Sequence, residues 1–446
     1  MVFNSFSFIF LFFPAFFLLF RWLPRRWCPY ALIGGSLVFY AIGVRRAPWQ
    51  LLLLVGLTAL GALGCHMLRA RWRRDKRMLA LWVSVVAAPL AFVKLAGLFL
   101  PDPPALPLGL SFYTFQLIAF LVCAWKGGGT TPIDVVAGTL MFPKLISGPI
   151  GEAEATLEAV RAPKRNRTRL DAGLEMFILG LAGKVIIADH LGGVLGQVRT
   201  WGPQAVSVPL AWIGVLGYAL QLYFDFWGYS LMAVGVARML GMILPDNFNH
   251  PYCAVSISEF WRRWHITLGE WFKRHVYIPL GGSRNGMGRM VLSTLTVWLL
   301  TGIWHGAGWN YLFWGLMMFA LIMGERLLYG KALQKLPVIG HIYVPLMVAL
   351  SWVFFIMPDL AGASAYFLRL FGAGGAPGDP QDWIKALSWC WPYLALGCAF
   401  STPLPGKLWR RVSGTGAGWA LLFVLFWVCM YFLGTAASDP FLYFSF

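Results

Sequence analysis

Charged side chains are scarce in this chain of 446 residues. Only 12% of its residues are Asp, Glu, Lys or Arg, whereas a soluble domain carries about 25%. Acidic side chains are the scarcer kind, with 18 Asp and Glu against 36 Lys and Arg. Hydrophobic residues make up 59% of the chain and form long runs that follow one another. This composition excludes a set of soluble domains and predicts an all-α, polytopic transmembrane helical bundle.

The motifs of several functional classes are absent as well. The seven cysteines are scattered, without metal-ligand spacing or the pattern of a disulfide framework. No HxxxH or HExxH pattern occurs, so the sequence predicts no metal site. A GxSxG elbow and a P-loop are also missing, which leaves serine hydrolase and NTPase functions without support. The net charge of +18 does not indicate nucleic-acid binding, because the basic residues form short runs between apolar segments, as in cytoplasmic loops.

The apolar runs predict about ten to twelve membrane spans. The first run, 3–20, has no basic residue before it and Arg21, Arg25 and Arg26 after it, which is typical of a retained span whose second end faces the cytoplasm. Other predicted spans lie at 29–44, 49–68, 78–100, 106–125, 170–198, 212–242, 309–328, 338–357, 383–401 and 418–433. Together they predict one integral-membrane domain over 1–446, with N-terminal spans at 1–125, a catalytic stretch at about 134–330 and C-terminal spans at 338–446.

Several segments do not fit a simple span. Residues 134–150 are interrupted by Pro143, Lys144, Gly148 and Pro149, so we expect a re-entrant or cavity-lining segment. The polar stretch 152–169 is predicted to be a cytoplasmic loop, and 361–371 an interfacial helix. Lys184 and Asp189 are five residues apart, so we expect them to flank different faces or an interface rather than to pair closely.

The stretch 247–309 gathers polar side chains between aromatic residues. His305 is the only Asp, Glu, Lys, Arg or His between Met290 and Gly324, and an ionisable group within apolar sequence is a candidate functional group. Gly306 and Gly308 follow it, and we expect them to leave room for a ligand beside the imidazole. A neutral histidine in such surroundings is suited to take a proton from a hydroxyl. The alternative is that it only forms a hydrogen bond between helices.

A second histidine, His265, follows two arginines. On one helix Glu259 and Arg263 would form an i,i+4 pair, and Arg262 would neighbour His265 at i,i+3 and disfavour its protonated form. The loop PLGGSRNG (279–286) is either an ordinary turn or a phosphate cradle.

Asp225 is the only charged residue between Arg199 and Arg238. It is either an interfacial aspartate at a helix break near Gly228 or a carboxylate that faces the site, where it would orient a histidine or bind substrate.

Six stretches carry a resemblance to a known family. They are LPLGLSFYTFQ (106–116), FPKLISGPI (142–150), LQLYFDFWGYS (220–230), NFNHPY (247–252), SISEFWRRWHITLGEWFKRHVYIPLGG (256–282) and LTGIWHGAGWNYLFWG (300–315), and the end PFLYFSF (440–446) adds to them. In these stretches the chain resembles the membrane-bound O-acyltransferase family, and within it the bacterial branch that O-acetylates alginate. The match departs from this branch at Trp227 and Leu231, where the branch often has Ser and Asp.

The resemblance implies a helical bundle around a tunnel, with an acyl donor entering from the cytoplasm and an acceptor from the opposite side. It implies that His305 is catalytic and that His265 is its companion. The donor substrate would be acetyl-CoA or another acyl thioester, with no permanently bound cofactor. Further candidate substrate-binding residues are Asp225, Asn249, Glu259, Arg262, Arg263, Lys273 and Arg284.

The implied setting is the bacterial inner membrane, where a multi-pass protein surrounded by membrane lipids would serve O-acetylation of an exopolysaccharide of the alginate or cellulose type. A separate periplasmic acetyltransferase is the expected partner. Three alternatives stay open: D-alanyl transfer to teichoic acid, a lipid-linked sugar or acyl transporter, and a haem-binding electron carrier.

Overall fold

The computed structural model describes residues 1–100, 102, 104–306, 308–375 and 378–435. Throughout these residues the regular structure is helical, which confirms the predicted all-α class. The chain forms two compact units. The first comprises Met1–Gly180 and Tyr229–Asp246, and the second comprises the described residues of Leu181–Gly228 and Asn247–Phe446. The division into N-terminal, catalytic and C-terminal stretches stays a prediction, and the family-like end 440–446 lies outside the described residues.

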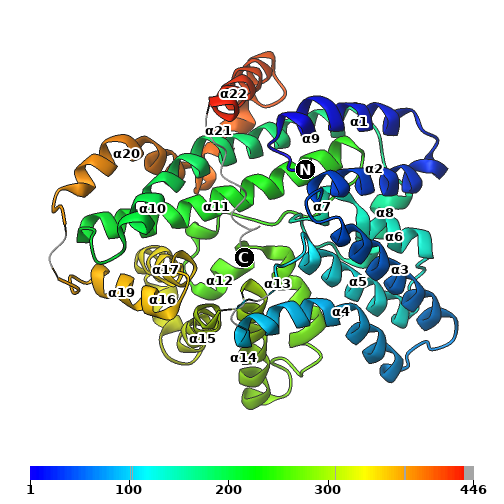
Figure 1. Cartoon of the computed structure of the whole chain (residues 1–446), viewed down its shortest axis with the longest axis horizontal. Helices are drawn as coiled ribbons and strands as arrows, with labels where there is room; N and C mark the ends of the chain where they lie inside the picture. The colour runs from blue at the N-terminus through cyan, green and yellow to red at the C-terminus, as the bar shows by residue number, and fades with distance from the viewer. Residues whose placement is uncertain (101, 103, 307, 376–377, 436–446) are drawn as a thin grey trace. The chain divides into compact units, whose positions relative to one another are not determined.

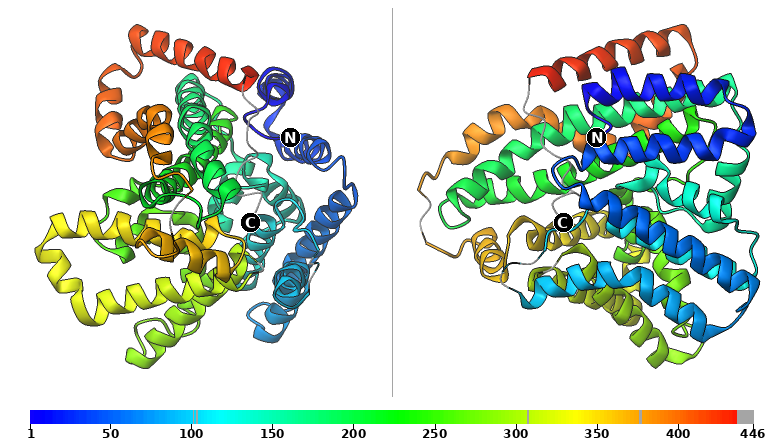
Figure 2. Two further views of the ribbon diagram at one scale, coloured as in Figure 1. Left: turned by 60° about the vertical axis from the view of Figure 1, so that its left-hand side comes forward. Right: turned by 45° about the vertical axis from the view of Figure 1, so that its right-hand side comes forward.

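The first unit contains the helices of the N-terminal part of the chain (Figure 1). They are α1 (Phe13–Trp22), α2 (Cys28–Gly43), α3 (Trp49–Ala70), α4 (Lys76–Phe99), α5 (Leu110–Lys126), α6 (Pro132–Leu140), α7 (Phe142–Leu145), α8 (Ala153–Arg161) and α9 (Arg167–Ala182). Helix α5 forms the centre of this unit, since nearly every residue from Leu110 to Ala124 is buried. Helices α3 and α4 run in opposite directions and both pack against it (Figure 2).

The second unit contains the remaining helices. They are α10 (Asp189–Trp201), α11 (Val208–Met239, which passes into the first unit at Tyr229), α12 (Ile257–Arg263), α13 (Ile266–Phe272), α14 (Gly286–His305), α15 (Trp309–Gly324), α16 (Gly330–Lys335), α17 (Pro337–Ser351), α18 (Val353–Ile356), α19 (Leu360–Leu370), α20 (Asp382–Phe400), α21 (Pro403–Val412) and α22 (Gly416–Thr435). Short π-helical segments continue several of them, at Gly183–Ala188, Lys273–Tyr277 and Glu325–Tyr329.

Seven helices among the described residues are long and apolar enough to cross a membrane. They span Trp49–Ala70, Lys76–Phe99, Val208–Met239, Gly286–His305, Trp309–Lys335, Pro337–Ile356 and Gly416–Thr435. The number is below the predicted ten to twelve because several predicted spans form shorter helices, such as Ser7–Trp22 and Leu110–Lys126. The protein is therefore a multi-pass membrane protein whose long spans are joined by shorter helices.

The segment 134–150 is interrupted, as the sequence predicted, although Pro143 and Lys144 lie inside a short helix. Helix α6 ends at Leu140, α7 is a single turn, and residues 146–150 are buried without helical structure. The hydroxyl of Ser36 accepts a hydrogen bond from the amide of Phe142 at 3.0 Å. The ammonium of Lys144 donates to the side chains of Gln116 at 2.8 Å and Thr156 at 2.9 Å. Protein side chains thus bind one backbone amide at the break and the buried ammonium of Lys144.

The predicted loop 152–169 was wrong in its first half. Residues Ala153–Arg161 form α8, which buries Leu157 and Val160 on one face. Arg161 at its end forms an ion pair with Asp134 at the start of α6. The high charge of the stretch suggested a loop, but its apolar residues recur at helical spacing and pack against the unit.

Two basic segments of the first unit meet at the end of α1. The guanidinium of Arg165 donates to the carbonyls of Phe20 at 2.6 Å and Leu23 at 2.9 Å, and Arg21 donates to the carbonyl of Arg165 at 2.7 Å. The carbonyls of Phe20 and Leu23 lie at the C-terminal end of α1, where cations are stabilised by the helix dipole. The predicted topology placed both basic segments in the cytoplasm, and their contact agrees with a common side of the membrane.

Candidate active site

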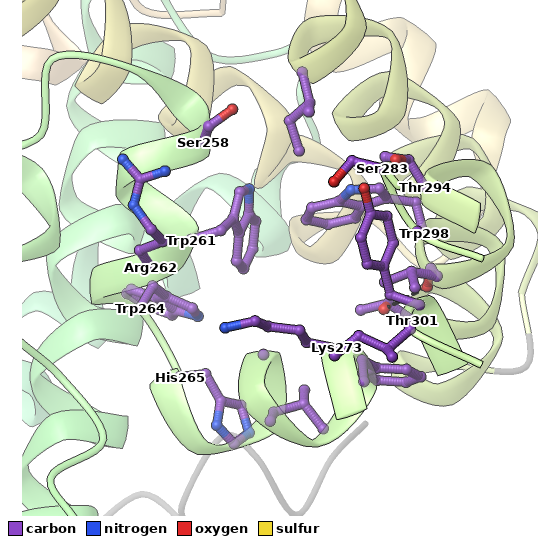
Figure 3. A pocket seen from close by; sticks show the side chains of 18 of the residues that line it. Ser258, Trp261, Arg262, Trp264, His265, Lys273, Ser283, Thr294, Trp298 and Thr301 are labelled. Carbon is purple, nitrogen blue, oxygen red and sulfur yellow. Dashed lines mark hydrogen bonds between the residues drawn. The ribbon is translucent and has the colours of Figure 1, made fainter. Parts of the chain in front are cut away.

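A cavity of about 700 Å³ lies in the second unit. Its walls come from α12, α13, the π-helical turn after α13, the loop that precedes α14, and α14 itself (Figure 3). Five of the predicted site residues line it: Arg262, His265, Lys273, Arg284 and His305. Tryptophans, tyrosine and aliphatic side chains make up most of the remaining wall. An apolar cavity of this size with a few convergent polar groups is typical of a small-molecule site.

His305 is the last residue of α14 and is 7% exposed. Its ring stands edge-on to Trp314, with 5.0 Å between ring centroids, and to Phe355 at 5.1 Å. The neighbouring Trp304 ring lies 4.6 Å away. Three aromatic rings from α14, α15 and α18 therefore fix the orientation of the imidazole, which reaches the cavity from the end of its helix.

The expectation that two glycines leave ligand space beside His305 was wrong. A Cβ atom on Gly306 would lie 2.0 Å from the ring of Tyr311, and one on Gly308 would lie 2.2 Å from the amide oxygen of Asn310. The missing side chains make room for the first turn of α15, not for a ligand. Gly302 and Gly315 continue this close packing, because a Cβ on either would lie 2.6 or 2.5 Å from a carbonyl oxygen of the partner helix.

His265 lies between helices, and the prediction that it shares a helix face with Arg262 was wrong. Helix α12 ends at Arg263, Trp264 is extended, and His265 adopts left-handed backbone angles of φ 44° and ψ 51°. Such a conformation is uncommon for a residue with a side chain and is often found at functional sites. Arg262 and His265 meet at the same cavity because the chain turns between them.

The His265 side chain is 3% exposed. Its ring stands edge-on to Phe226 of α11 at a centroid distance of 4.7 Å, and the Trp304 ring lies at 6.1 Å. Because burial disfavours the charged imidazolium, it lowers the pKa of His265 below its ordinary value. Burial produces the neutral form that the sequence had attributed to a neighbouring cation.

The charged side chains that line the cavity are all cations. Arg262, Lys273 and Arg284 are exposed, and no carboxylate occurs among the described residues of the wall. Lys273 also donates to Glu270 at 3.0 Å. In the loop at the cavity wall, Gly281 has a φ of 110° and Gly282 a φ of 51°, left-handed angles that favour glycine. The arrangement suits an anionic ligand group next to the two histidines.

The other predicted substrate-binding residues are not brought to this wall. Glu259 pairs with Arg263 at 2.6 Å, as the i,i+4 spacing predicted, and also accepts from the amide of Val255 at 2.9 Å. Asn249 is exposed, and its backbone N–H donates to the carbonyl of Arg263 at 2.9 Å. Their role in binding stays a prediction.

Asp225 faces a different set of residues. It is 1% exposed and lies 2.7 Å from the ammonium of Lys184, which also contacts Asp189. The expectation that Lys184 and Asp189 do not pair closely was wrong, because Gly183–Ala188 is a π-helical turn and the i→i+5 spacing of that turn brings them together. Asp225 also lies within a continuous helix rather than at a break near Gly228.

Sequence reasoning missed Asn247, which is 2% exposed. Its side-chain oxygen contacts Nδ1 of His265 at 3.1 Å and the hydroxyl of Thr267 at 3.0 Å. The residue belongs to the same family-like motif as Asn249, but spacing alone does not show that this asparagine, 18 residues before His265, meets the imidazole.

Comparisons with known proteins match the part of the chain that contains the site. The family model for the membrane-bound O-acyltransferase family matches residues 140–364, which include both histidines. The chain is 33% identical to the probable alginate O-acetylase AlgI of Azotobacter vinelandii over 84% of this chain and 79% of that protein. It is 31% identical to the peptidoglycan O-acetyltransferase of Helicobacter pylori over 84% of this chain and 80% of that protein.

A more distant relative carries out a third kind of acyl transfer. The teichoic acid D-alanyltransferase of Bacillus subtilis is 28% identical over 47% of this chain and 56% of that protein. The acyl-transferring relatives, the matched family model and the histidine-lined cavity lead to one conclusion: the chain belongs to the membrane-bound O-acyltransferase family and is an O-acyltransferase.

Proposed function

We propose that this acyltransferase moves an acetyl group from a cytoplasmic thioester across the bacterial inner membrane, for O-acetylation of an exopolysaccharide of the alginate or cellulose type. The observation that carries the proposal is the shared cavity, in which His265 and His305 lie among Arg262, Lys273 and Arg284. Two buried imidazoles supply proton transfer, and three cations supply attraction for an anionic donor.

His305 acts as the general base in this proposal. It takes the proton of the acceptor hydroxyl while the hydroxyl oxygen attacks the thioester carbonyl. The new C–O bond forms, the C–S bond breaks, and the imidazolium returns the proton to the departing thiolate. The products are an O-acetyl ester and a free thiol, so no further reactant is needed. Proton transfer of this kind typically contributes ~10²–10⁴-fold to a rate.

The donor we propose is acetyl-CoA or another acyl thioester on a phosphate-bearing carrier. The cavity of about 700 Å³ far exceeds the needs of an acetyl group and falls within the ~300–1,000 Å³ of sites for larger ligands. Arg262, Lys273 and Arg284 are the side chains we assign to the phosphates of the carrier. No permanently bound cofactor is needed for this chemistry.

The acceptor we propose is a hydroxyl of a separate periplasmic acetyltransferase, which passes the acetyl group to the polymer. The polymer class is supported by the names of the similar proteins, an alginate O-acetylase and a peptidoglycan O-acetyltransferase. Neither the donor nor the partner follows from those names, so both are tested directly.

Transfer of labelled acetyl from acetyl-CoA, measured in membranes with and without the partner, tests the proposal. We expect His305→Ala to lower the rate by ~10²–10⁴-fold, and His265→Ala to lower it as well. His341→Ala is the matched control, because His341 is exposed and lies outside the cavity wall. Full activity of a well-folded His305→Ala protein would overturn the assignment. Transfer of D-alanyl but not acetyl groups would support the D-alanyltransferase alternative instead.

A further inference from the structure

We infer that Asn247 is a positioning residue that holds His265 in one tautomer, with the proton on Nδ1 and the lone pair on Nε2. The inference rests on the proposed role of His265 in acyl transfer and extends it to a residue outside the cavity wall.

The orientation of the Asn247 amide is fixed by its neighbours. The backbone amide of Thr267 points at Oδ1 at 3.3 Å, and a backbone N–H only donates, so the atom that it meets must be an acceptor. The Thr267 hydroxyl lies 3.0 Å from the same oxygen. An Asn247 amide turned the other way would set its NH₂ group against the N–H of Thr267.

The orientation of the Asn247 amide determines which nitrogen of the His265 imidazole carries the proton. Nδ1 of His265 lies 3.1 Å from Oδ1 of Asn247. Since an amide oxygen only accepts, Nδ1 must carry a hydrogen to make this contact favourable. A neutral imidazole has one N–H, so Nε2 is left with the lone pair and is the nitrogen that accepts a proton or a hydrogen bond.

Asn247 also supports the strained backbone beneath the imidazole. Its carbonyl accepts a hydrogen bond from the amide of Ile266 at 3.0 Å, directly after the left-handed His265. Its side chain holds Thr267, as described above. One residue therefore contacts three consecutive positions, 265 to 267, and an uncommon conformation persists only when its surroundings determine it in this way.

Phe226 packs edge-on against the imidazole at a centroid distance of 4.7 Å, so an aromatic ring covers one side of it. The charged and titratable side chains that share the cavity wall with His265 include Arg262 on α12, Lys273 after α13, Arg284 in the loop before α14 and His305 on α14. On α11, the residue before Phe226 is Asp225, which is paired with Lys184. None of these wall side chains is a carboxylate, and the neutral oxygen of Asn247 stabilises the protonated form of His265 less than a carboxylate in its place would.

Substitution of Asn247 by Asp and by Ala tests this inference. Asn247→Asp keeps an acceptor for Nδ1 and Thr267 but adds a negative charge that stabilises the imidazolium. We expect near-normal kcat at high pH and an acidic limb of the pH–rate profile that moves to higher pH. Asn247→Ala removes the acceptor, and we expect kcat to fall by roughly 10- to 100-fold, within what a proton-transfer group contributes, with little change in KM.

Thr267→Val is the matched control. It removes the hydroxyl that contacts Oδ1 but leaves the backbone amide and the Asn247–His265 contact in place. We expect its pH–rate profile to match that of the wild type. A purely structural role for Asn247 would lower the folded yield of the variants without moving the profile, so an unshifted profile in folded Asn247→Asp would overturn the inference.

Nitrogen-15 NMR of histidine-labelled wild-type protein provides a test that needs no active variant, with the His265 signals assigned by their loss in His265→Gln. We expect a protonated Nδ1 and an unprotonated Nε2, and the reverse pattern would overturn the inference. A failure of the proposed function is distinguishable, because full acetyl transfer by His265→Ala would remove the role of His265 whatever its tautomer.

Discussion

The ammonium of Lys184 lies 2.7 Å from the carboxylate of Asp225 inside the second unit. The two side chains are 3% and 1% exposed, and Lys184 also contacts the carboxylate of Asp189. This group ties the π-helical turn Gly183–Ala188 to the middle of α11. The next residue of α11, Phe226, packs against His265, so the ion pair and the site share one helix.

We expect Lys184→Met to destabilise the protein by about 3–5 kcal/mol, because removal of one partner leaves a buried carboxylate without its cation. The effect is measured by thermal unfolding of the purified protein, which is monitored as the loss of its monodisperse form. The control is Arg167→Gln, which breaks a pair whose side chains are 92% and 45% exposed. Exposed pairs contribute only about 0–1 kcal/mol, so equal losses in the two variants would contradict the prediction.

A second prediction concerns the end of α14. A methyl group at position 306 would lie 2.0 Å from the Tyr311 ring, so Gly306→Ala must displace the Tyr311 ring, the helix α15 that carries it, or the adjacent His305. We expect acyl transfer to fall at least tenfold, the effect of about 1.4 kcal/mol on the barrier. Gly288→Ala is the control on the same helix, because nothing lies within 4 Å of its new methyl group. Equal activity in the two variants would show that Tyr311 moves aside without disturbing the site.

The sequence predicted the all-α membrane class, an interruption in 134–150 and the two histidines as candidate site residues. Each of these depends on local composition or on a recognisable motif. It did not predict the left-handed turn at His265, the π-helical pairing of Lys184 with Asp189, or the Tyr311 ring beside Gly306. These depend on residues that are distant in sequence or on a departure from α-helical spacing. Asn247 shows the same limit, since only the folded chain brings its oxygen to the imidazole.

A third prediction concerns the cations of the cavity wall. We expect Arg262→Gln, Lys273→Gln and Arg284→Gln each to raise the KM for acetyl-CoA several-fold while changing kcat less, because attraction to the donor phosphates acts on binding. Added salt should raise the KM for acetyl-CoA more in the wild type than in the variants, since it screens exposed charges. Lys331→Gln, an exposed substitution outside the wall, is the control. An unchanged KM in all three cavity variants would remove the phosphate assignment.

A fourth prediction follows from the burial of His265. Its pKa in the folded protein is lowered from the ordinary value of 6.5, so below that pH the unfolded chain binds a proton that the folded protein does not. Stability linked to this group is therefore present above pH 6.5 and declines as the pH falls, by up to about 1.4 kcal/mol per pH unit until the folded protein is protonated as well.

The unfolding temperature of wild-type protein should consequently drop between pH 7 and pH 5 by more than that of His265→Gln, whose side chain does not titrate. Other groups that titrate in this range contribute equally to both proteins, so the difference between the two curves isolates His265. The acid limb of acetyl transfer that is due to His265 should lie below pH 6.5 for the same reason, because the neutral imidazole persists in the folded protein. If the unfolding temperatures of the two proteins changed equally with pH, His265 would be as accessible to protons in the folded state as in the unfolded chain. Burial would then not hold it neutral.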